Sequence, residues 1–400
     1  MRLAPGEIEE AMVGDGTWPC FAADEIEAAA AVLRSGRVNY WTGEEGRRFE
    51  QEFAHASGTR HGVALANGSL ALELALVVLG IGPGDEVVTT PRSYFASASS
   101  IVLRGAIPVF ADVDRDSQNV TPATVAAVLT PRTRAVLCVH LAGWPVDMDG
   151  IVALARAHDL RVIEDCAQAH GARWRDRPVG GFGDVAAFSF CQDKIVTTGG
   201  EGGMLVTDDA ALWRAAWSYK DHGKSWEAVH ERRHPPGFRW LHEGFGSNWR
   251  LTEMQAAIGR IQLRKLAGWV ERRRQNAAIL DRHLAELPAL RLAPPPAEAY
   301  HARYKYYAFV RPERLRPGWD RDRIIEAVNA RGVWCGSGAC PEIYREKAFR
   351  DLGLGPEERL PVARELGTTS LMLQVHPTLD DAAMARHARI VAEVVGEATG

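Results

Sequence analysis

The chain has 400 residues, 46% of them hydrophobic, and a formal net charge of −4. This length exceeds the size at which a single hydrophobic core stops growing, so we expect two domains. The slight excess of acidic side chains gives no electrostatic reason to expect binding to nucleic acid or to an anionic membrane.

Signals for export or membrane insertion are not evident in the sequence. The first ten residues lack the apolar region of a signal peptide. The best apolar run, residues 70–81, contains Glu73 and is too short to span a bilayer. No pair of the six cysteines has the C-x₂-C spacing of a zinc site. Their scattered positions are typical of reduced thiols in a cytosolic protein. We therefore expect a cytoplasmic protein with no membrane partner.

Short apolar runs rich in β-branched residues alternate with helical segments in the first half of the chain. Strands are predicted at residues 62–66, 86–89, 107–110, 135–139, 160–163 and 185–190. A helix is predicted over residues 69–79, and another begins at Thr121, which can cap it ahead of Pro122. This alternation predicts a mostly parallel sheet covered on both faces. Ligands of such sheets bind beyond the carboxyl ends of the strands.

From about residue 248 to residue 287 the sequence takes a helical period and becomes highly charged. Three consecutive arginines, residues 272–274, favour a solvated helix face over a site for a polyanion. Further on, a strand is predicted at 304–310 and a helix at 380–395. We predict a large α/β domain over residues 1–265 and a smaller α/β domain over residues 266–400.

A carboxylate and a lysine follow two of the predicted strands. Asp165 closes the segment Val162-Ile163-Glu164-Asp165 at the end of an apolar strand. Lys194 follows the run 188–190 by a short loop, with a glycine-rich stretch at 199–203 where backbone can approach a ligand. Both side chains therefore fall on the rim where ligands bind. A carboxylate that can pair with a ring nitrogen and a lysine that can form an imine are the two groups that pyridoxal phosphate (PLP) requires from a protein. Taken alone, the pair is better explained as a solvated salt bridge.

A candidate phosphate site lies between the first predicted strand and the helix that follows it. In the turn 67–69, Gly68 lets the backbone approach an anion, and the following N–H groups and the helix dipole face that anion. By itself, a glycine here is more simply explained as a turn residue. In combination with Asp165, Ser189 and Lys194, it favours a PLP site.

Several ordered motifs resemble those of one enzyme family. They run collinearly through residues 67–72, 82–87, 108–114, 139–141, 163–171, 189–194, 200–203, 221–223 and 246–250, with a weaker match at 375–377. In these motifs the chain resembles the DegT/DnrJ/StrS family of PLP-dependent sugar aminotransferases, which have the aspartate aminotransferase type of α/β architecture (fold type I). An ordered series of motifs is far more specific than any one of them.

The resemblance implies a role for each matching residue around PLP. Lys194 would bind PLP covalently and, once released by the amino donor, would move a proton between the substrate and the cofactor. Asp165 would pair with the ring nitrogen and keep it protonated. Gln168 would contact the phenolic oxygen of the ring.

The resemblance also implies a phosphate site that two subunits share. Gly68, Ser69 and Ser189 would bind the phosphate, joined by Asn248 from a neighbouring subunit. The expected assembly is therefore a homodimer with active sites at the subunit interface.

The resemblance implies further contacts with PLP and the substrate, and for two of them another interpretation is open. Tyr94 matches the aromatic residue that stacks on the PLP ring, although Phe95 could stack in its place. Arg250 would bind the carboxylate of the amino donor, although a structural ion pair explains it equally well. His222 is a candidate substrate contact. Three other histidines have open roles: His140, His170 and His376.

The residues around two of these positions depart from the family pattern. The run 191–193 ahead of the lysine reads Cys-Gln-Asp, where the family more usually has His or Tyr, then Pro or Ala, then Thr. Beside Tyr94, Ser93 and Phe95 stand where the family commonly has Thr and a small aliphatic residue. Local contacts at both places therefore need not follow the family.

One short motif points to a metal. His230-Glu231-Arg232-Arg233-His234 matches the H-E-x-x-H pattern of helical zinc sites. Two prolines follow at once and disfavour a helix at His234. We therefore predict a charged loop and no metal site.

The sequence thus predicts a PLP-dependent aminotransferase of amino-sugar biosynthesis. An amino acid, glutamate by family resemblance, would donate the amino group, and the expected acceptor is a nucleotide-linked keto-sugar. A keto-cyclitol and a free oxidised sugar acid are alternative acceptors. A PLP-dependent sugar dehydratase is another alternative, against which Lys194 argues because such family members carry histidine there. The last alternative is a non-catalytic PLP-binding regulator, which neither a basic patch nor a helix-turn-helix segment supports.

Overall fold

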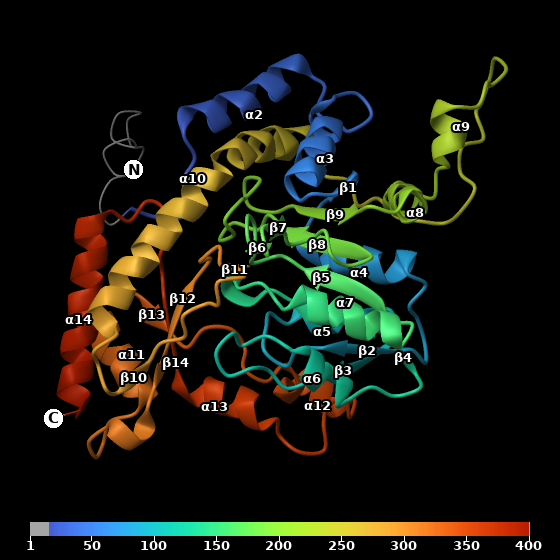
Figure 1. Cartoon of the computed structure of the whole chain (residues 1–400). Helices are drawn as coiled ribbons and strands as arrows, with labels where there is room; N and C mark the ends of the chain where they lie inside the picture. The colour runs from blue at the N-terminus through green and yellow to red at the C-terminus, as the bar shows by residue number, and fades with distance from the viewer. Residues whose placement is uncertain (1–15, 400) are drawn as a thin grey trace.

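A seven-stranded sheet forms the largest layer of the computed structural model, which describes residues 16–399 (Figure 1). The first ten residues, in which the sequence predicts no signal peptide, lie outside the described part of the chain. The strands are β1 (His61–Leu65), β2 (Glu86–Thr89), β3 (Ile107–Phe110), β4 (Thr133–Val139), β5 (Arg161–Asp165), β8 (Val185–Ser189) and β9 (Gly203–Thr207). Their order is β1-β9-β8-β5-β4-β2-β3, and only β9 runs antiparallel to its neighbours in this sheet. The mostly parallel sheet is confirmed.

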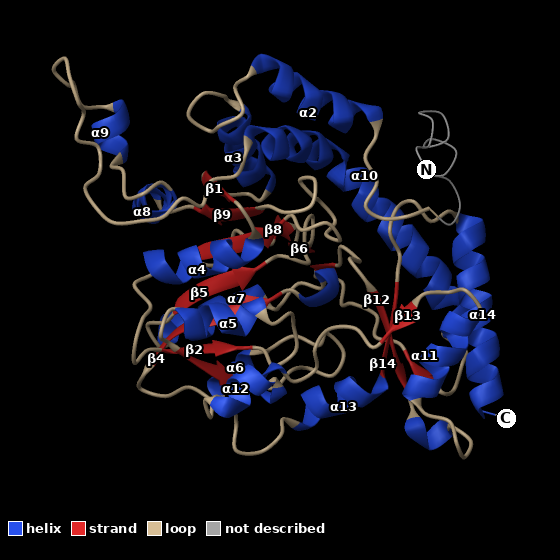
Figure 2. Ribbon diagram, turned by 180° about the vertical axis from the view of Figure 1, so that it is seen from behind, coloured by secondary structure: helices blue, strands red, loops and turns tan. Residues whose placement is uncertain are grey.

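The sheet buries side chains on both of its faces. In β4, Leu137 and Val139 belong to the core that includes α4 (Gly68–Val78), whereas Val136 and Cys138 belong to the core that includes α7 (Met148–Ala157). Double burial explains why this strand reads as a continuous apolar run. The remaining helices around the sheet are α2 (Ala23–Ser35), α3 (Glu45–Ala56), α5 (Ala96–Leu103), α6 (Pro122–Ala126), α8 (Ala210–Lys220) and α9 (Trp226–His230). Figure 2 shows helices on both sides of the strands.

A second, antiparallel sheet organises the C-terminal part. Its order is β10-β12-β14-β13, and its strands are β10 (Leu290–Arg291), β12 (Tyr306–Val310), β13 (Cys335–Gly336) and β14 (Ser370–Leu373). The helices of this part are α11 (Arg321–Ala330), α12 (Lys347–Asp351), α13 (Pro361–Thr369) and α14 (Asp381–Thr399). A small third sheet connects the two parts through β6 (Arg173–Trp174), β7 (Arg177–Pro178) and β11 (Ala299–Tyr300).

The long helix α10 (Glu253–Leu284) belongs to both parts. Its first half lies beside α2 and its second half beside α14 (Figure 1). The predicted boundary at residue 265 falls inside this helix, so a division at that residue stays a prediction. None of the helices in the described part of the chain is both long and apolar enough to cross a bilayer.

The arginine run of α10 is not the solvated face that the sequence favoured. Arg272 donates to the carbonyl of Leu379, and Arg273 is only 2% exposed. The Arg274 guanidinium lies 4.1 Å from the centre of the Tyr300 ring. The periodicity identified the helix, but it could not show that the C-terminal part packs over this face.

The predicted elements of the large sheet lie within a few residues of the observed ones. At the start of α6, the Thr121 hydroxyl accepts a hydrogen bond from the Thr124 N–H, and Pro122 takes the first helical position, as predicted. The strand β9 was not predicted, because the glycines at 199–203 were interpreted only as backbone that approaches a ligand. Gly203 instead begins β9, where an added Cβ would lie 2.3 Å from the Asn67 carbonyl oxygen.

Candidate active site

The carboxyl ends of β5 and β8 and the start of α4 enclose a cavity of about 570 Å³. Seven of the residues predicted for the site line it: Gly68, Ser69, Tyr94, Asp165, Gln168, Ser189 and Lys194. They come from separate segments that the parallel strands bring to one edge of the sheet. The cavity therefore lies where the strand pattern placed a ligand.

Asp165 ends β5 as a buried carboxylate that is held by two hydrogen bonds. The Ser97 hydroxyl donates to its Oδ2 at 2.7 Å, and the Ala167 N–H donates to its Oδ1 at 3.1 Å. Burial raises the pKa of Asp165, although these two hydrogen bonds oppose the rise. A protonated ring nitrogen in the cavity would stabilise the ionised carboxylate, which is the pairing that PLP needs.

The turn from β1 into α4 forms a cradle for an anion. The Asn67 side chain caps α4 by accepting from the Leu70 N–H at 2.9 Å. The N–H groups of Gly68 and Ser69, at the start of the same helix, remain available to an anion. A Cβ on Gly68 would lie 2.5 Å from the Ser189 Cβ, closer than side chains approach. Only glycine lets the helix start come this near to Ser189, so the cradle fits a phosphate group.

Lys194 lies between an acid and a phenol at the cavity wall. Its Nζ donates to the Asp193 Oδ1 at 2.7 Å and lies 3.5 Å from the Tyr304 hydroxyl oxygen. That hydroxyl in turn donates to the other carboxylate oxygen of Asp193. The Lys194 side chain is 17% exposed, so the amine is reachable from the cavity.

Gln168 and Tyr94 lie on the same cavity wall. The Gln168 Oε1 accepts from the Ala142 N–H at 2.8 Å, an orientation in which the amide Nε2 can donate toward a ligand. Tyr94 is 71% exposed and lines the cavity, whereas the Phe95 ring packs against the Phe349 ring at a centroid distance of 5.4 Å. Of the two candidate stacking residues, the structure directs Tyr94 toward the site.

Three predicted residues do not line this cavity: His222, Asn248 and Arg250. They surround Asp221 at the end of α8. Asp221 is fully buried and accepts from the Arg250 Nη1 at 2.8 Å, and a backbone bridge pairs it with Asn248. Arg250 therefore forms an ion pair within its own chain, and its role toward the donor carboxylate stays a prediction.

Four residues were not predicted for the site: Ser97, Asp193 and Glu201, which line the cavity, and Tyr304, which contacts Lys194 without lining it. Asp193 stood out only as a departure from the family pattern. Ser97 lies in α5, three residues after Tyr94, and this spacing could have identified it once a helix was assigned there. Tyr304 precedes β12 in the other sheet, and no local signal relates it to Lys194.

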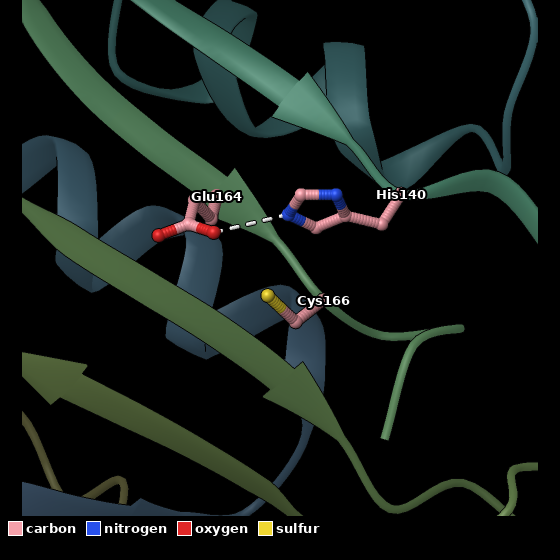
Figure 3. A group of neighbouring side chains, drawn as sticks. All are labelled: His140, Glu164 and Cys166. Atoms are coloured by element: carbon pink, nitrogen blue, oxygen red, sulfur yellow. Dashed lines mark hydrogen bonds and ion pairs between the residues drawn. The ribbon is translucent and has the colours of Figure 1, made fainter. Parts of the chain in front are cut away.

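Among the described residues, three buried side chains gather as metal ligands would: His140, Glu164 and Cys166 (Figure 3). Both nitrogens of His140 are already engaged, Nδ1 by the Val146 N–H and Nε2 by Glu164. The Glu164 carboxylate also accepts backbone N–H groups from the turn 180–183. Burial raises the pKa of the Cys166 thiol well above its usual value. The nitrogens of His140 and the carboxylate oxygens of Glu164 are therefore already occupied, and the Cys166 thiol is held in its protonated form.

The H-E-x-x-H motif does not lie on a helix. The helix α9 ends at His230, and the His234 ring interacts with the Ala228 carbonyl. The two histidines therefore lack the one-turn spacing on a common face that a zinc site of this kind requires. The other histidines with open roles, His170 and His376, are buried outside the cavity.

Comparisons with known proteins point to one family. The model of the DegT/DnrJ/EryC1/StrS aminotransferase family matches residues 19–394. The UDP-N-acetyl-3-dehydro-alpha-D-glucosamine 3-aminotransferase of Acidithiobacillus ferrooxidans is 39% identical over 354 residues, which cover 88% of this chain and 89% of that protein. The dTDP-3-amino-3,4,6-trideoxy-alpha-D-glucose transaminase of Streptomyces venezuelae is 38% identical over 90% of this chain and 88% of its own length.

A solved structure shows the same fold. The crystal structure of the aminotransferase from Psychrobacter cryohalolentis superimposes with a TM-score of 0.95 at 51% sequence identity. The match covers 96% of this chain and 100% of that chain.

Proposed function

Because the chain belongs to the DegT/DnrJ/EryC1/StrS aminotransferase family, whose members depend on PLP, we propose that it transfers an amino group from glutamate to a nucleotide-linked keto-sugar. The two curated relatives described above bear names that place their chemistry on carbon 3 of UDP- and dTDP-linked hexoses. A nucleotide-linked 3-keto-hexose is therefore the acceptor that the relatives favour. The observation that supports the residue roles is the cavity that Lys194, Asp165 and Gly68 share.

In this mechanism three side chains of the cavity act on the ring of the cofactor. When bound, PLP would supply the ring that accepts electrons from the substrate carbon. Lys194 would hold the cofactor and, when free, would carry the proton at its Nζ. Asp165, held by Ser97, would accept a hydrogen bond from the ring nitrogen. Tyr94 would cover the open face of the ring.

The other side chains would hold the cofactor in place. Gly68, Ser69 and Ser189 would bind the phosphate at the start of α4. Gln168 would donate from its Nε2 to the phenolic oxygen of the ring. Each of these groups is fixed by the fold before the cofactor arrives, which reduces the ordering that binding requires.

The functional unit in this proposal is a cytoplasmic homodimer whose partner subunit supplies Asn248 to the phosphate. The support is that Asn248 lies outside the cavity of its own chain. The segment that precedes Asn248, residues 231–247, extends away from the body together with α9 (Figures 1 and 2). It carries Phe238 and Trp240, whose side chains are 78% and 81% exposed. Large exposed aromatic side chains indicate a partner surface.

The proposed function is tested with the purified holoenzyme. Glutamate should change the visible absorption of bound PLP and yield one equivalent of 2-oxoglutarate per site before any acceptor is added. UDP- and dTDP-linked 3-keto-hexoses, a keto-cyclitol and an oxidised sugar acid should then be compared as acceptors. Turnover confined to the cyclitol or the sugar acid would refute the nucleotide-sugar assignment, and no 2-oxoglutarate with glutamate would refute the donor.

A further inference from the structure

Asp193, Lys194 and Tyr304 form a small network at the rear of the cavity. The carboxylate of Asp193 accepts on both of its oxygens, from the Lys194 Nζ at 2.7 Å on one and from the Tyr304 hydroxyl on the other. Tyr304 lies 110 positions after Lys194. Its ring is nearly fully buried between the two parts of the molecule. The network therefore has a buried phenol behind a carboxylate and a lysine that both line the cavity.

The charges around Asp193 hold it as an anion. Burial alone would raise the pKa of Asp193, but the charge of Lys194 and the hydrogen bonds from Lys194 and Tyr304 outweigh it and lower the pKa. Burial raises the pKa of the Tyr304 hydroxyl well above its usual value, so this group stays a donor. Two further cations lie close by, Lys305 and Arg273, whose pKa values burial lowers to about 8 and about 9. In these surroundings the Asp193 carboxylate stays ionised.

The Asp193 carboxylate binds two donors at once, Lys194 on one oxygen and Tyr304 on the other. The proposed function gives this carboxylate no role of its own. Its nearest cation is the amine that the proposed function assigns to PLP. The 2.7 Å ion pair with Asp193 holds the Lys194 ammonium in one position.

We propose that Asp193 and Tyr304 form a dock that receives the Lys194 amine each time the amine is not bonded to PLP. The inference rests on the role that the proposed function gives to Lys194. Asp193 and Tyr304 are positioning residues in this proposal, since the contacts that carry it are those that they make with Lys194 and with each other. When Lys194 is free, its neutral amine would accept a proton at Nζ, and Asp193 would stabilise the resulting ammonium until that proton is given up again.

The first test uses full-length protein from which PLP has been removed. Limiting acetic anhydride labels neutral amines, and the acetylation of Lys194 is measured by mass spectrometry at pH 8. Asp193→Asn should label about three- to tenfold faster, because the 2.7 Å ion pair that occupies the Lys194 Nζ is lost at a partly exposed site. Tyr304→Phe should give a smaller increase in the same direction.

The chain contains a matched control pair. The Tyr306 hydroxyl donates to the Asp281 Oδ1 at 2.8 Å, two residues further along the same segment and away from the cavity. Asp281→Asn and Tyr306→Phe should leave the labelling of Lys194 unchanged. Equal labelling of Lys194 in the wild type, Asp193→Asn and Tyr304→Phe would overturn the dock.

The second test separates positioning from binding in the holoenzyme. Asp193→Asn should lower kcat with glutamate about tenfold, leave KM for glutamate nearly unchanged, and enlarge the isotope effect of glutamate deuterated at the α-carbon. A higher KM with normal kcat would refute the dock. Lys194→Ala is the arm that tests the proposed function, because turnover in that variant would remove Lys194 from its role. An inactive Lys194→Ala together with a normal Asp193→Asn would refute the dock alone.

Discussion

Gly68 is the residue on which the close approach of α4 to β8 depends. In Gly68→Ala the added methyl group meets the Cβ and the backbone of Ser189 at 2.5 and 3.0 Å, so either the helix start or the strand end must move. We expect the Kd for PLP, measured by absorbance titration, to rise at least about tenfold, equivalent to about 1.4 kcal/mol. The control is Gly268→Ala in α10, where an added Cβ meets nothing within 4 Å. That exchange should stabilise the helix by about 1 kcal/mol and leave PLP binding unchanged. Normal PLP affinity in Gly68→Ala would contradict the cradle.

His170 makes the folded protein sensitive to acid. Burial lowers its pKa from 6.5 to about 3, with the charges of Lys194 and Arg273 as further causes. Below pH 6.5 the unfolded chain takes up a proton that the folded chain refuses, so the stability present above pH 6.5 is lost as the pH falls toward 3. Between pH 7 and pH 5 this loss amounts to about 2 kcal/mol.

The variant His170→Phe should lack this component of the pH dependence. Urea unfolding of the variant at pH 7 and at pH 5 should show a difference in stability about 2 kcal/mol smaller than that of the wild type. Because each protein is compared with itself, a change in packing around the new ring cancels. His55→Gln, at an exposed histidine, should follow the wild type. An unchanged acid response of His170→Phe would show that this histidine is protonated in the folded protein.

The residues of the candidate site differ in how far the sequence could identify them. Asp165 ends an apolar strand run and Lys194 follows the next one by the short loop 191–193, so their place at the sheet edge depends only on chain order. Tyr304 reaches Lys194 only when the C-terminal part closes on the sheet, and no pattern within 304–310 encodes that contact. Arg250 shows the same limit. Its ion pair with Asp221 joins residues 29 positions apart, and no local pattern predicts that contact.

At the scale of elements, Glu164 couples β5 to the turn that precedes β8. Its carboxylate accepts N–H groups from Gly180, Phe182 and Gly183 and interacts with His140. Burial alone would raise the pKa of Glu164, but the hydrogen bond and charge of His140 and the backbone donors lower it. The carboxylate thus contributes stability above the usual pKa of a glutamate that is lost as the pH falls through the lowered value.

Glu164→Gln tests this coupling against the metal interpretation. The amide nitrogen of glutamine would face N–H donors, so we expect a loss of stability of about 2–4 kcal/mol by urea unfolding. EDTA should leave the Tm of the wild type unchanged, because His140 and Glu164 of Figure 3 satisfy each other and the backbone. Glu357→Gln at an exposed position is the control. A lower Tm in EDTA that zinc restores would contradict this account.

The elements that the sequence predicted are those whose burial is continuous. The parallel strands read as apolar runs because helices cover both faces, as β4 illustrates. The strand β9 is also buried at all five residues, but it begins with Gly203, so its apolar run was hidden behind the interpretation of 199–203 as a turn near a ligand. The two-residue strands, such as β6 and β7, are too short to show any period. Pairing and docking, rather than local pattern, determine these elements.

At the scale of the whole molecule, the projecting segment 231–247 makes a testable case for the dimer. Phe238 and Trp240 stack edge to face at 4.9 Å and are mostly exposed. Replacing both with serine should shift the protein from dimer to monomer in light scattering at micromolar concentration, since apolar aromatic side chains dominate interface energies. Trp334→Ser, which removes a half-exposed tryptophan from the C-terminal part, should leave the dimer intact. A double variant that remains dimeric would refute this role of the segment.

A mixing experiment decides whether Asn248 serves its own cavity or that of the partner. Lys194→Ala and Asn248→Ala should each have strongly reduced activity as homodimers. In a mixed dimer with sites at the interface, one site would combine the intact Lys194 of one subunit with the intact Asn248 of the other, while the second site would carry both changes. After unfolding and refolding at equal amounts, half of the dimers are mixed, so about a quarter of the wild-type activity should return. If Asn248 acted within its own chain, every site of the mixture would keep one defect and no activity would be regained.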